Sequence, residues 1–168
     1  MVRAMTTPGA HAFDFIHGSW AVHNRKLRDA PDPTCEDWVE FDATSEAFPV
    51  LMGGGHLDRM TVLEAPDGPP FEGMTLRLFD PQEQDWSIWW SSTRAPGRLD
   101  PPLAGRFTDG RGVFEGDDRI GDRPVRLRFE WLADPVSPRW QQEFSYDGGK
   151  TWFRNWVMVF TRRASAGG

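Results

Sequence analysis

The end of the chain carries the clearest structural signal: residues 139–163 read RWQQEFSYDGGKTWFRNWVMVFTRR. Two β-rich runs, at residues 139–145 and 151–162, are separated by Asp147, Gly148 and Gly149. Aspartate accepts backbone hydrogen bonds across a tight turn, and glycine adopts the positive φ angles that such turns require. The stretch therefore predicts an antiparallel hairpin.

The same turn matches a known motif. Its SYDGGKTW segment has the spacing of the Asp-box of sialidase-type propellers, in which the aspartate organises the turn and the tryptophan packs beneath it. A propeller needs the motif in several blades, and this chain has one copy. We therefore expect Asp147 to stabilise the hairpin and to have no catalytic role.

The rest of the chain repeats the alternation of short β-rich runs with clusters of glycine, proline and aspartate. Further runs lie at residues 20–27, 37–44, 56–63, 74–79, 86–91, 105–108, 113–117 and 124–131. Apolar 3.6-residue periodicity is almost absent, so the only helix expected is a short turn before Trp20. About ten strands predict an all-β protein, an antiparallel up-and-down β-barrel, because closure removes the exposed edges that invite aggregation.

Three longer connections are rich in proline, glycine and aspartate. They occupy residues 28–34, 65–70 and 93–102, and we expect them to form the mouth and rim of the barrel. The sequence has no internal repeat and no sign of a second domain. We therefore predict that residues 1–168 form a single domain. The first ten residues and residues 164–168 are expected to be disordered.

Charge and composition exclude several classes of function. The chain has 168 residues, a formal net charge of -6 and a pI near 5.2, which disfavours nucleic acid and anionic membranes as partners. Its start lacks the apolar run of a signal peptide, and Cys35 is the single cysteine. These features predict a soluble protein of the reducing cytoplasm.

The aromatic content is high, with 9 Trp and 12 Phe against one Tyr. Such rings are costly to expose, so they must fill a core, a pocket or an interface. Some strands are apolar on both faces: Trp89 alternates with Trp86, Ile88 and Trp90. Because a monomeric barrel has one dry face, this surplus predicts a homodimer.

Polar residues among aromatic neighbours mark the candidate binding site. Arg128, Gln142 and Asn155 lie on the last three predicted strands. If the hairpins keep register, the three side chains converge in one cavity, lined also by Trp89. Buried polar groups either satisfy one another or await the oxygen atoms of a ligand, and both alternatives remain open. His56, after three glycines, either reaches the barrel mouth or lies on the surface.

Metal and covalent chemistry have no visible candidates. The four histidines, His11, His17, His23 and His56, lack ligand spacing, so no metal site is predicted. No Gly-x-Ser-x-Gly elbow is present. Cys35 lies in an acidic loop, an unfavourable setting for a reactive thiolate.

Several motifs together resemble a bacterial family of uncharacterised lipocalin-like (calycin) β-barrel proteins. The matching stretches include FDFIHGSW, MTLRLFDP with WSIWWSS, and SYDGGKTW, and the resemblance extends over about residues 13–163. It implies that Trp20 of the Gly-x-Trp start plugs the closed end and that Arg162 of the last strand packs over it. Haem-binding barrels of similar shape have a longer glycine motif at this start and a histidine late in the chain. This sequence has neither, so no cofactor is expected.

Three functions fit these observations. The first is a carrier or sensor that holds a small hydrophobic or aromatic molecule through Trp89, Arg128, Gln142, Asn155 and His56. The second is a cofactor-free cyclase, isomerase or hydrolase for a polyketide-like or terpenoid molecule, in which Arg128, His56 or Glu143 polarises the substrate or moves a proton. The third is an interaction module with a filled barrel. A continuous interior cavity separates the first two from the third.

Overall fold

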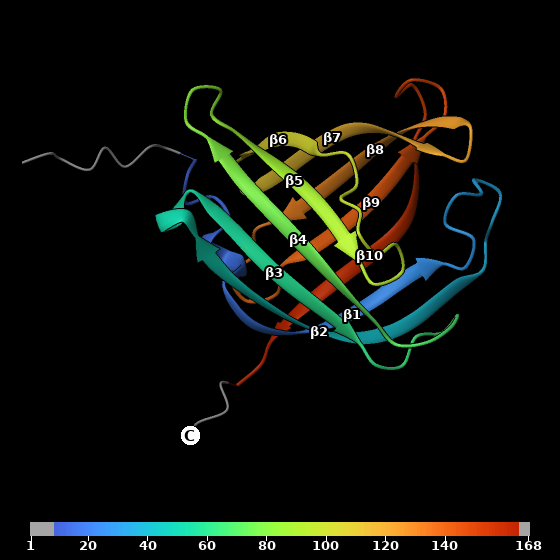
Figure 1. Ribbon diagram of the computed structural model, residues 1–168, viewed down its shortest axis with the longest axis horizontal. Coiled ribbons are helices and arrows are strands. Elements are labelled where there is room, and N and C mark those ends of the chain that lie inside the picture. The colour runs from blue at the N-terminus through green and yellow to red at the C-terminus, as the bar shows by residue number, and fades with distance from the viewer. Residues whose placement is uncertain (1–8, 165–168) are drawn as a thin grey trace, which may run out of the picture.

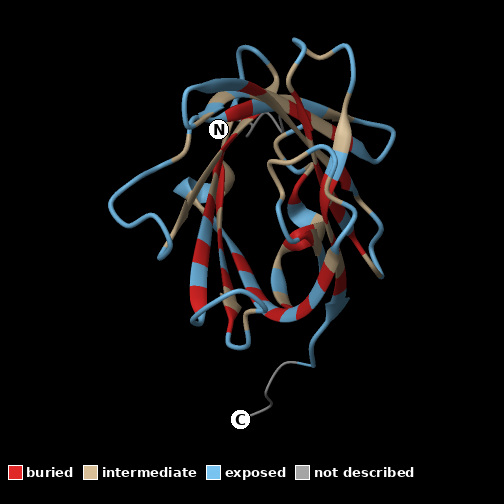
Figure 2. Ribbon diagram, turned by 90° about the vertical axis from the view of Figure 1, so that its right-hand side faces the viewer, coloured by how far each residue is buried: buried red, intermediate tan, exposed pale blue. Residues whose placement is uncertain are grey.

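The first strand shows why these residues form a barrel wall. Along β1 (Gly18–Leu27), Trp20, Val22 and Asn24 are buried while Ala21 and His23 are exposed. Side chains of a strand alternate between its faces, so this pattern gives one covered and one solvated face. The same alternation appears in most strands as bands of buried and exposed residues (Figure 2).

The computed structural model describes residues 9–164, and ten antiparallel strands close into one barrel (Figure 1). Each strand pairs with its neighbours in the sequence, and β1 pairs with β10 to complete the ring. The remaining strands are β2 (Trp38–Val50), β3 (Gly55–Val62), β4 (Phe71–Asp80), β5 (Asp85–Ser92), β6 (Leu103–Thr108), β7 (Arg111–Ile120), β8 (Arg123–Leu132), β9 (Arg139–Ser145) and β10 (Phe153–Arg162). The predicted all-β up-and-down barrel is confirmed, and its lipocalin-like character follows from the comparison given below.

One end of the barrel is plugged by the segment before β1. The 3-10 turn η1 (Asp14–Ile16) buries Ile16, and the preceding Phe13 packs edge-on against Trp86 at a centroid distance of 5.1 Å. Trp20 donates its indole N–H to the carbonyl oxygen of Ile16 at 2.8 Å. The guanidinium of Arg162 lies 4.1 Å from the Trp20 ring, as the Gly-x-Trp resemblance implies.

The opposite end collects the long connections. An up-and-down order places residues 28–37, 63–70 and 93–102 at the same end, away from η1. The expected rim loops therefore do meet. The chain differs from expectation in three places: β2 extends six residues further than predicted, a second 3-10 turn η2 (Leu51–Gly53) follows it, and Gly9 accepts a hydrogen bond from Trp86 at 3.0 Å. Residues 1–8 and 165–168, which were expected to be disordered, lie outside the described residues.

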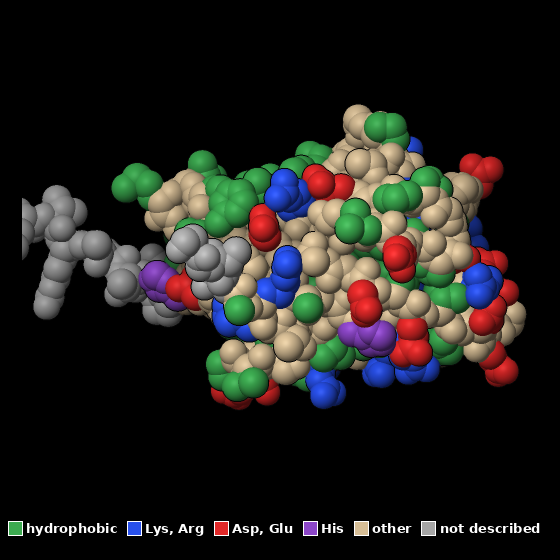
Figure 3. Space-filling model, turned by 90° about the horizontal axis from the view of Figure 1, so that it is seen from below, with side chains coloured by type: hydrophobic (Ala, Val, Ile, Leu, Met, Phe, Trp, Pro, Cys, Tyr) green, Lys and Arg blue, Asp and Glu red, His purple; other side chains and the backbone are tan. Residues whose placement is uncertain are grey.

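The charged side chains of the outer surface are interspersed. Figure 3 shows acidic, basic and histidine side chains next to one another on the face seen from below. On neighbouring strands, Arg59 pairs with Glu46 at 3.0 Å and His23 contacts Asp42 at 2.8 Å. Among the described residues, no helix is both long and apolar enough to cross a membrane.

The last hairpin is built around Asp147, as its motif predicts. The Asp147 carboxylate accepts hydrogen bonds from the backbone N–H groups of Lys150 and Thr151 and from the hydroxyl groups of Ser145 and Thr151. These donors hold the pKa of Asp147 far below its usual value. Trp152 closes the turn by donating its indole N–H to the Gly149 carbonyl oxygen at 3.0 Å.

Replacing Asp147 with alanine is expected to lower the Tm by several degrees, because four donors lose their shared acceptor. Differential scanning calorimetry would measure the change. Asp122→Ala, in the β7–β8 turn, is a matched control, since no hydrogen bond is formed by the Asp122 carboxylate within residues 9–164. Equal Tm values for Asp147→Ala and the wild type would contradict the structural role.

Candidate functional site

The barrel encloses a cavity of about 270 Å³. This volume lies just below the usual range of about 300–1,000 Å³ for small-molecule sites. Most of its lining is apolar, and four strands contribute seven aromatic side chains: Trp90, Phe129, Trp131, Trp140, Phe144, Trp156 and Phe160. A continuous cavity excludes a barrel filled solid with side chains.

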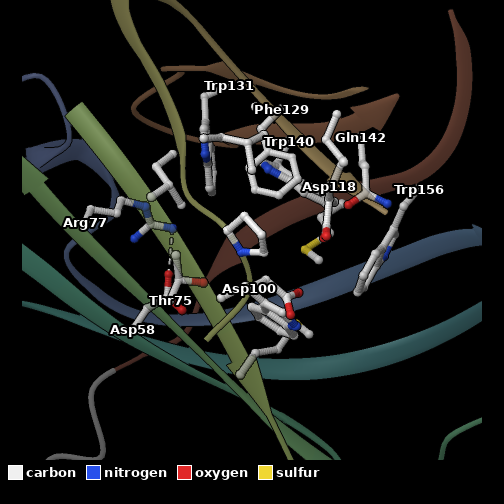
Figure 4. Close-up of a pocket in the computed structure, with 18 of the residues that line it drawn as sticks. Asp58, Thr75, Arg77, Asp100, Asp118, Phe129, Trp131, Trp140, Gln142 and Trp156 are labelled. Atoms are coloured by element: carbon white, nitrogen blue, oxygen red, sulfur yellow. Dashed lines mark ion pairs between the residues drawn. The ribbon is translucent and has the colours of Figure 1, made fainter. Parts of the chain in front are cut away.

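The polar lining is divided between the two ends of the cavity (Figure 4). Arg77 and Asp58 lie at one end, where β4 and β3 approach the η1 plug. Gln142 and Asp118 lie toward the other end, below the rim loops. A molecule in this cavity would therefore meet different chemistry at its two ends.

Arg77 is the most deeply buried charge of the cavity, with 2% of its surface exposed. Its Nη2 atom donates to Oδ2 of Asp58 at 2.7 Å. Its Nε and Nη1 atoms are buried without a hydrogen-bond partner among the described residues. Buried donors nearly always find an acceptor, so these two N–H groups are available to an acceptor other than the described side chains.

Two carboxylates face each other at the mouth. Asp118 projects inward from β7, and Asp100 lies in the loop between β5 and β6, fixed by a hydrogen bond from its own backbone N–H to the Trp90 carbonyl oxygen at 2.8 Å. Burial and the nearby charge of Asp118 raise the pKa of Asp100. The mouth is therefore acidic, and a negatively charged ligand would be repelled there.

Gln142 and Asn155 are brought together, as the strand pairing of β9 and β10 predicts. Gln142 lines the cavity and donates to Oδ1 of Asn155 at 2.9 Å. Asn155 is fully buried at a β-bulge and donates to the carbonyl oxygen of Ala30 at 3.0 Å. Asn155 does not line the cavity, so its place is behind Gln142, where it ties a rim loop to the barrel wall.

Arg128 lies on the outer surface, which contradicts its expected position in the cavity. It pairs with Glu115 at 3.1 Å and with Glu143 at 3.2 Å, and its guanidinium lies 3.9 Å from the Trp152 ring. The inner face of β8 is formed by Leu127 and Phe129 instead. Arg128 therefore forms ion pairs on the outer surface and does not join Gln142 and Asn155.

Trp89 also points outward, contrary to expectation, because its neighbours Ile88 and Trp90 face the cavity. It ends a row of directly opposed side chains across the outer face of β2 to β5: Phe48, Leu57, Leu76 and Trp89. The apolar surplus that the sequence showed therefore resides partly in this row. We call it the outer apolar row.

His56 is neither at the mouth nor on the surface. It is 1% exposed at the closed end, where its ring packs against Phe13 and Trp86 and its Nδ1 atom lies 3.1 Å from Nε2 of His17. Burial, with smaller contributions from the charges of His17 and Arg77, lowers its pKa to about 4. His56 is therefore a neutral part of the plug at pH 7, and it does not line the cavity.

The plug also contains a possible set of metal ligands. Atoms of Asp14, His17 and His56 lie within 4.8 Å of one another, a group of residue types that divalent metals accept. The two imidazoles already bond to each other. Burial lowers the pKa of both, with a smaller contribution from the charge of Arg77, which would also oppose a cation there. We assign no metal to these residues.

The sequence showed one overlooked signal for the cavity residues. In β4, Phe71, Gly73, Thr75 and Arg77 face inward. The more apolar alternate positions, such as Leu76, face outward. A strand whose inner face is the more polar one is typical of a lined site rather than a dry core.

Comparison with known proteins supports the architecture. The chain resembles the solved structure of the S-type phycobiliprotein lyase CPES from Guillardia theta, with a TM-score of 0.56, 13% sequence identity and alignment over 91% of both chains. This likeness identifies the fold as a lipocalin-like barrel. No protein-family model and no curated protein matches the chain, so the resemblance to a particular bacterial family remains a prediction.

Proposed function

We propose that this protein binds one small, largely apolar molecule inside the barrel. The observation that carries the proposal is the aromatic cavity of about 270 Å³, which extends from the closed end to the acidic mouth. Contact with flat rings supplies most of the binding free energy in such a site, and a few polar groups set the orientation. The similar solved structure is that of a lyase, and we carry no reaction over from it to this chain.

Binding without turnover is favoured over the enzyme alternative. The side chains proposed to polarise a substrate or move a proton were Arg128, Glu143 and His56, and none of them lines the cavity. Arg128 and Glu143 pair with each other outside, while His56 is sealed in the plug. Of the five predicted ligand contacts, Gln142 lines the cavity and is kept in the proposal, whereas Trp89, Arg128, Asn155 and His56 do not line it.

Association of two copies remains a proposal. It is supported by the outer apolar row, in which Phe48 is 48% exposed. A contiguous apolar surface of this kind is a common site of self-association. A cytoplasmic location remains an expectation from composition.

Ligand binding can be tested with N-phenyl-1-naphthylamine, an apolar dye whose fluorescence rises in dry sites. We expect saturable binding with quenching of tryptophan emission, because the dye would lie against Trp140 and Trp156. Leu127→Trp should fill the cavity and weaken binding at least tenfold, since overpacked sites reject a ligand.

The matched control is Leu132→Trp, which adds the same ring to an exposed position of β8. Its affinity for the dye should equal that of the wild type. Circular dichroism would establish that both variants are folded. Equal affinities for Leu127→Trp and Leu132→Trp would place the dye outside the barrel and refute the proposal.

A further inference from the structure

We infer that the ligand is an uncharged molecule with a carbonyl-type oxygen, which accepts hydrogen bonds from Arg77 at the deep end of the cavity. This inference rests on the proposed function and specifies its ligand class. It follows from the two partnerless nitrogen atoms of Arg77, from the rings that hold its guanidinium, and from the charges of the lining.

The unused donors of Arg77 supply the first step. One edge of the guanidinium is taken by Asp58, while Nε and Nη1 have no partner in residues 9–164. Each of these two nitrogens carries an N–H that can donate to an oxygen acceptor on its own; they form no fork with each other, because the Nη atom beside the Nε–H is Nη2, which is bonded to Asp58. A buried donor without an acceptor costs free energy, and the cost is higher for a charged donor than for a neutral one. This end of the cavity therefore favours a ligand oxygen atom.

The guanidinium is held in place before any ligand arrives. Its carbon atom lies 4.9 Å from the centroid of the Phe13 ring and 5.5 Å from that of Trp131. Its strand neighbours across β3 and β5 are His56 and Ile88, both buried. A donor fixed by rings and an ion pair loses little conformational entropy on binding, which strengthens each new hydrogen bond.

The charge of the cavity decides between a neutral and an anionic oxygen. Arg77 and Asp58 already neutralise each other. Asp100 and Asp118 add acidic groups to the lining, and Arg77 is its single basic residue. A ligand carboxylate would enter a net negative cavity, whereas a ketone, aldehyde or quinone oxygen adds no charge. The lining therefore favours a neutral carbonyl compound with an apolar ring body.

Three naphthalenes of equal size test this inference: 2-acetylnaphthalene, 2-isopropylnaphthalene and 2-naphthoate, each competing with N-phenyl-1-naphthylamine. The useful quantity is the ratio of the Kd of the isopropyl compound to that of the acetyl compound. We expect this ratio to fall about tenfold or more in the double variant Arg77→Met with Asp58→Asn, because a charge-assisted hydrogen bond is lost without leaving an unpaired carboxylate. The naphthoate should bind more weakly than the ketone to the wild-type protein.

Arg59→Met is the matched control, since Arg59 lies on the outer face of β3 and pairs with Glu46. It should leave the ratio unchanged. Should the double variant fail to fold, wild-type protein with 2-acetylnaphthalene labelled with ¹³C at the carbonyl gives an independent readout. Hydrogen bonding to Arg77 moves that resonance downfield from its position in an aprotic apolar solvent.

Each outcome has a separate meaning. If none of the three compounds displaces the dye and the dye itself does not bind, the proposed function fails. If all bind but the ratio is unchanged in the double variant, or the carbonyl resonance does not move, the role of Arg77 is refuted and the apolar site stands. Tighter binding of naphthoate than of the ketone would overturn the assignment of a neutral ligand.

Discussion

Replacing Gly73 with valine is expected to weaken binding of N-phenyl-1-naphthylamine at least tenfold. Gly73 faces inward from β4, and a Cβ atom there would lie 2.0 Å from Cη2 and 2.5 Å from Cζ2 of the Trp90 indole. Non-bonded carbon atoms do not approach so closely, so the indole must move away from β4. The cavity is the free space that Trp90 borders, and a displaced ring would occupy it. Fluorescence titration of the folded variant would measure the loss.

A rescue experiment separates a filled cavity from general damage. The clashing atoms belong to the outer ring of the indole, which phenylalanine lacks. Gly73→Ala combined with Trp90→Phe should therefore bind the dye more tightly than Gly73→Ala alone. Met74→Val, at the next and partly exposed position of the same strand, should leave the affinity unchanged. Full affinity in Gly73→Val would show that Trp90 does not border the bound dye.

Acidification from pH 6.5 to pH 4 is expected to lower the free energy of unfolding by about 2 kcal/mol through His56 alone. The pKa of His56 is about 4 in the folded protein and 6.5 when it is exposed, so the unfolded chain takes up a proton in this range that the folded chain refuses. Stability from this group is complete above pH 6.5 and is lost progressively toward pH 4. The full difference in pKa would give roughly 3 kcal/mol, and water entering the plug on protonation reduces it.

Urea denaturation between pH 7 and pH 4.5, followed by tryptophan fluorescence, would measure the loss. Carboxylates also titrate at the acid end, so the contribution of His56 is the difference between the wild type and His56→Gln. His23→Gln is the control, because His23 is exposed and its pKa is raised by Asp42 and Glu40. The His23→Gln variant should lose as much unfolding free energy on acidification as the wild type. Parallel curves for wild type and His56→Gln would refute the role of the buried imidazole.

The partial success of the binding-site prediction has a specific cause. Gln142 and Asn155 were expected to meet because they lie on consecutive strands, and their hydrogen bond follows from that local pairing. Arg128 failed because a charged residue among apolar ones can face either side of a strand, and here Glu115 and Glu143 on the neighbouring strands hold it outside. If the inward face of a strand is assigned one position off, every side chain of that strand is placed on the wrong face.

Arg77 and Asp58 could not be paired from the sequence. They lie on adjacent strands, but directly opposite Arg77 is His56, and Asp58 is displaced by two residues. The ion pair forms because both side chains point into the same closed space. His56 was misplaced for a related reason, since its burial depends on η1, a segment about forty residues earlier in the chain.

The sequence by itself determined the elements of this protein: ten strands, the turns between them, the Asp147 hairpin, the rim loops and the Trp20 plug. These depend on residues near one another in the chain, since turn chemistry and the alternation of side chains act over a few positions. The tertiary structure alone decided which face of each strand points inward and which charges meet there. Closure of β1 against β10 fixes those faces together, and it leaves Arg77 in an aromatic cavity with two donors unused among the described residues.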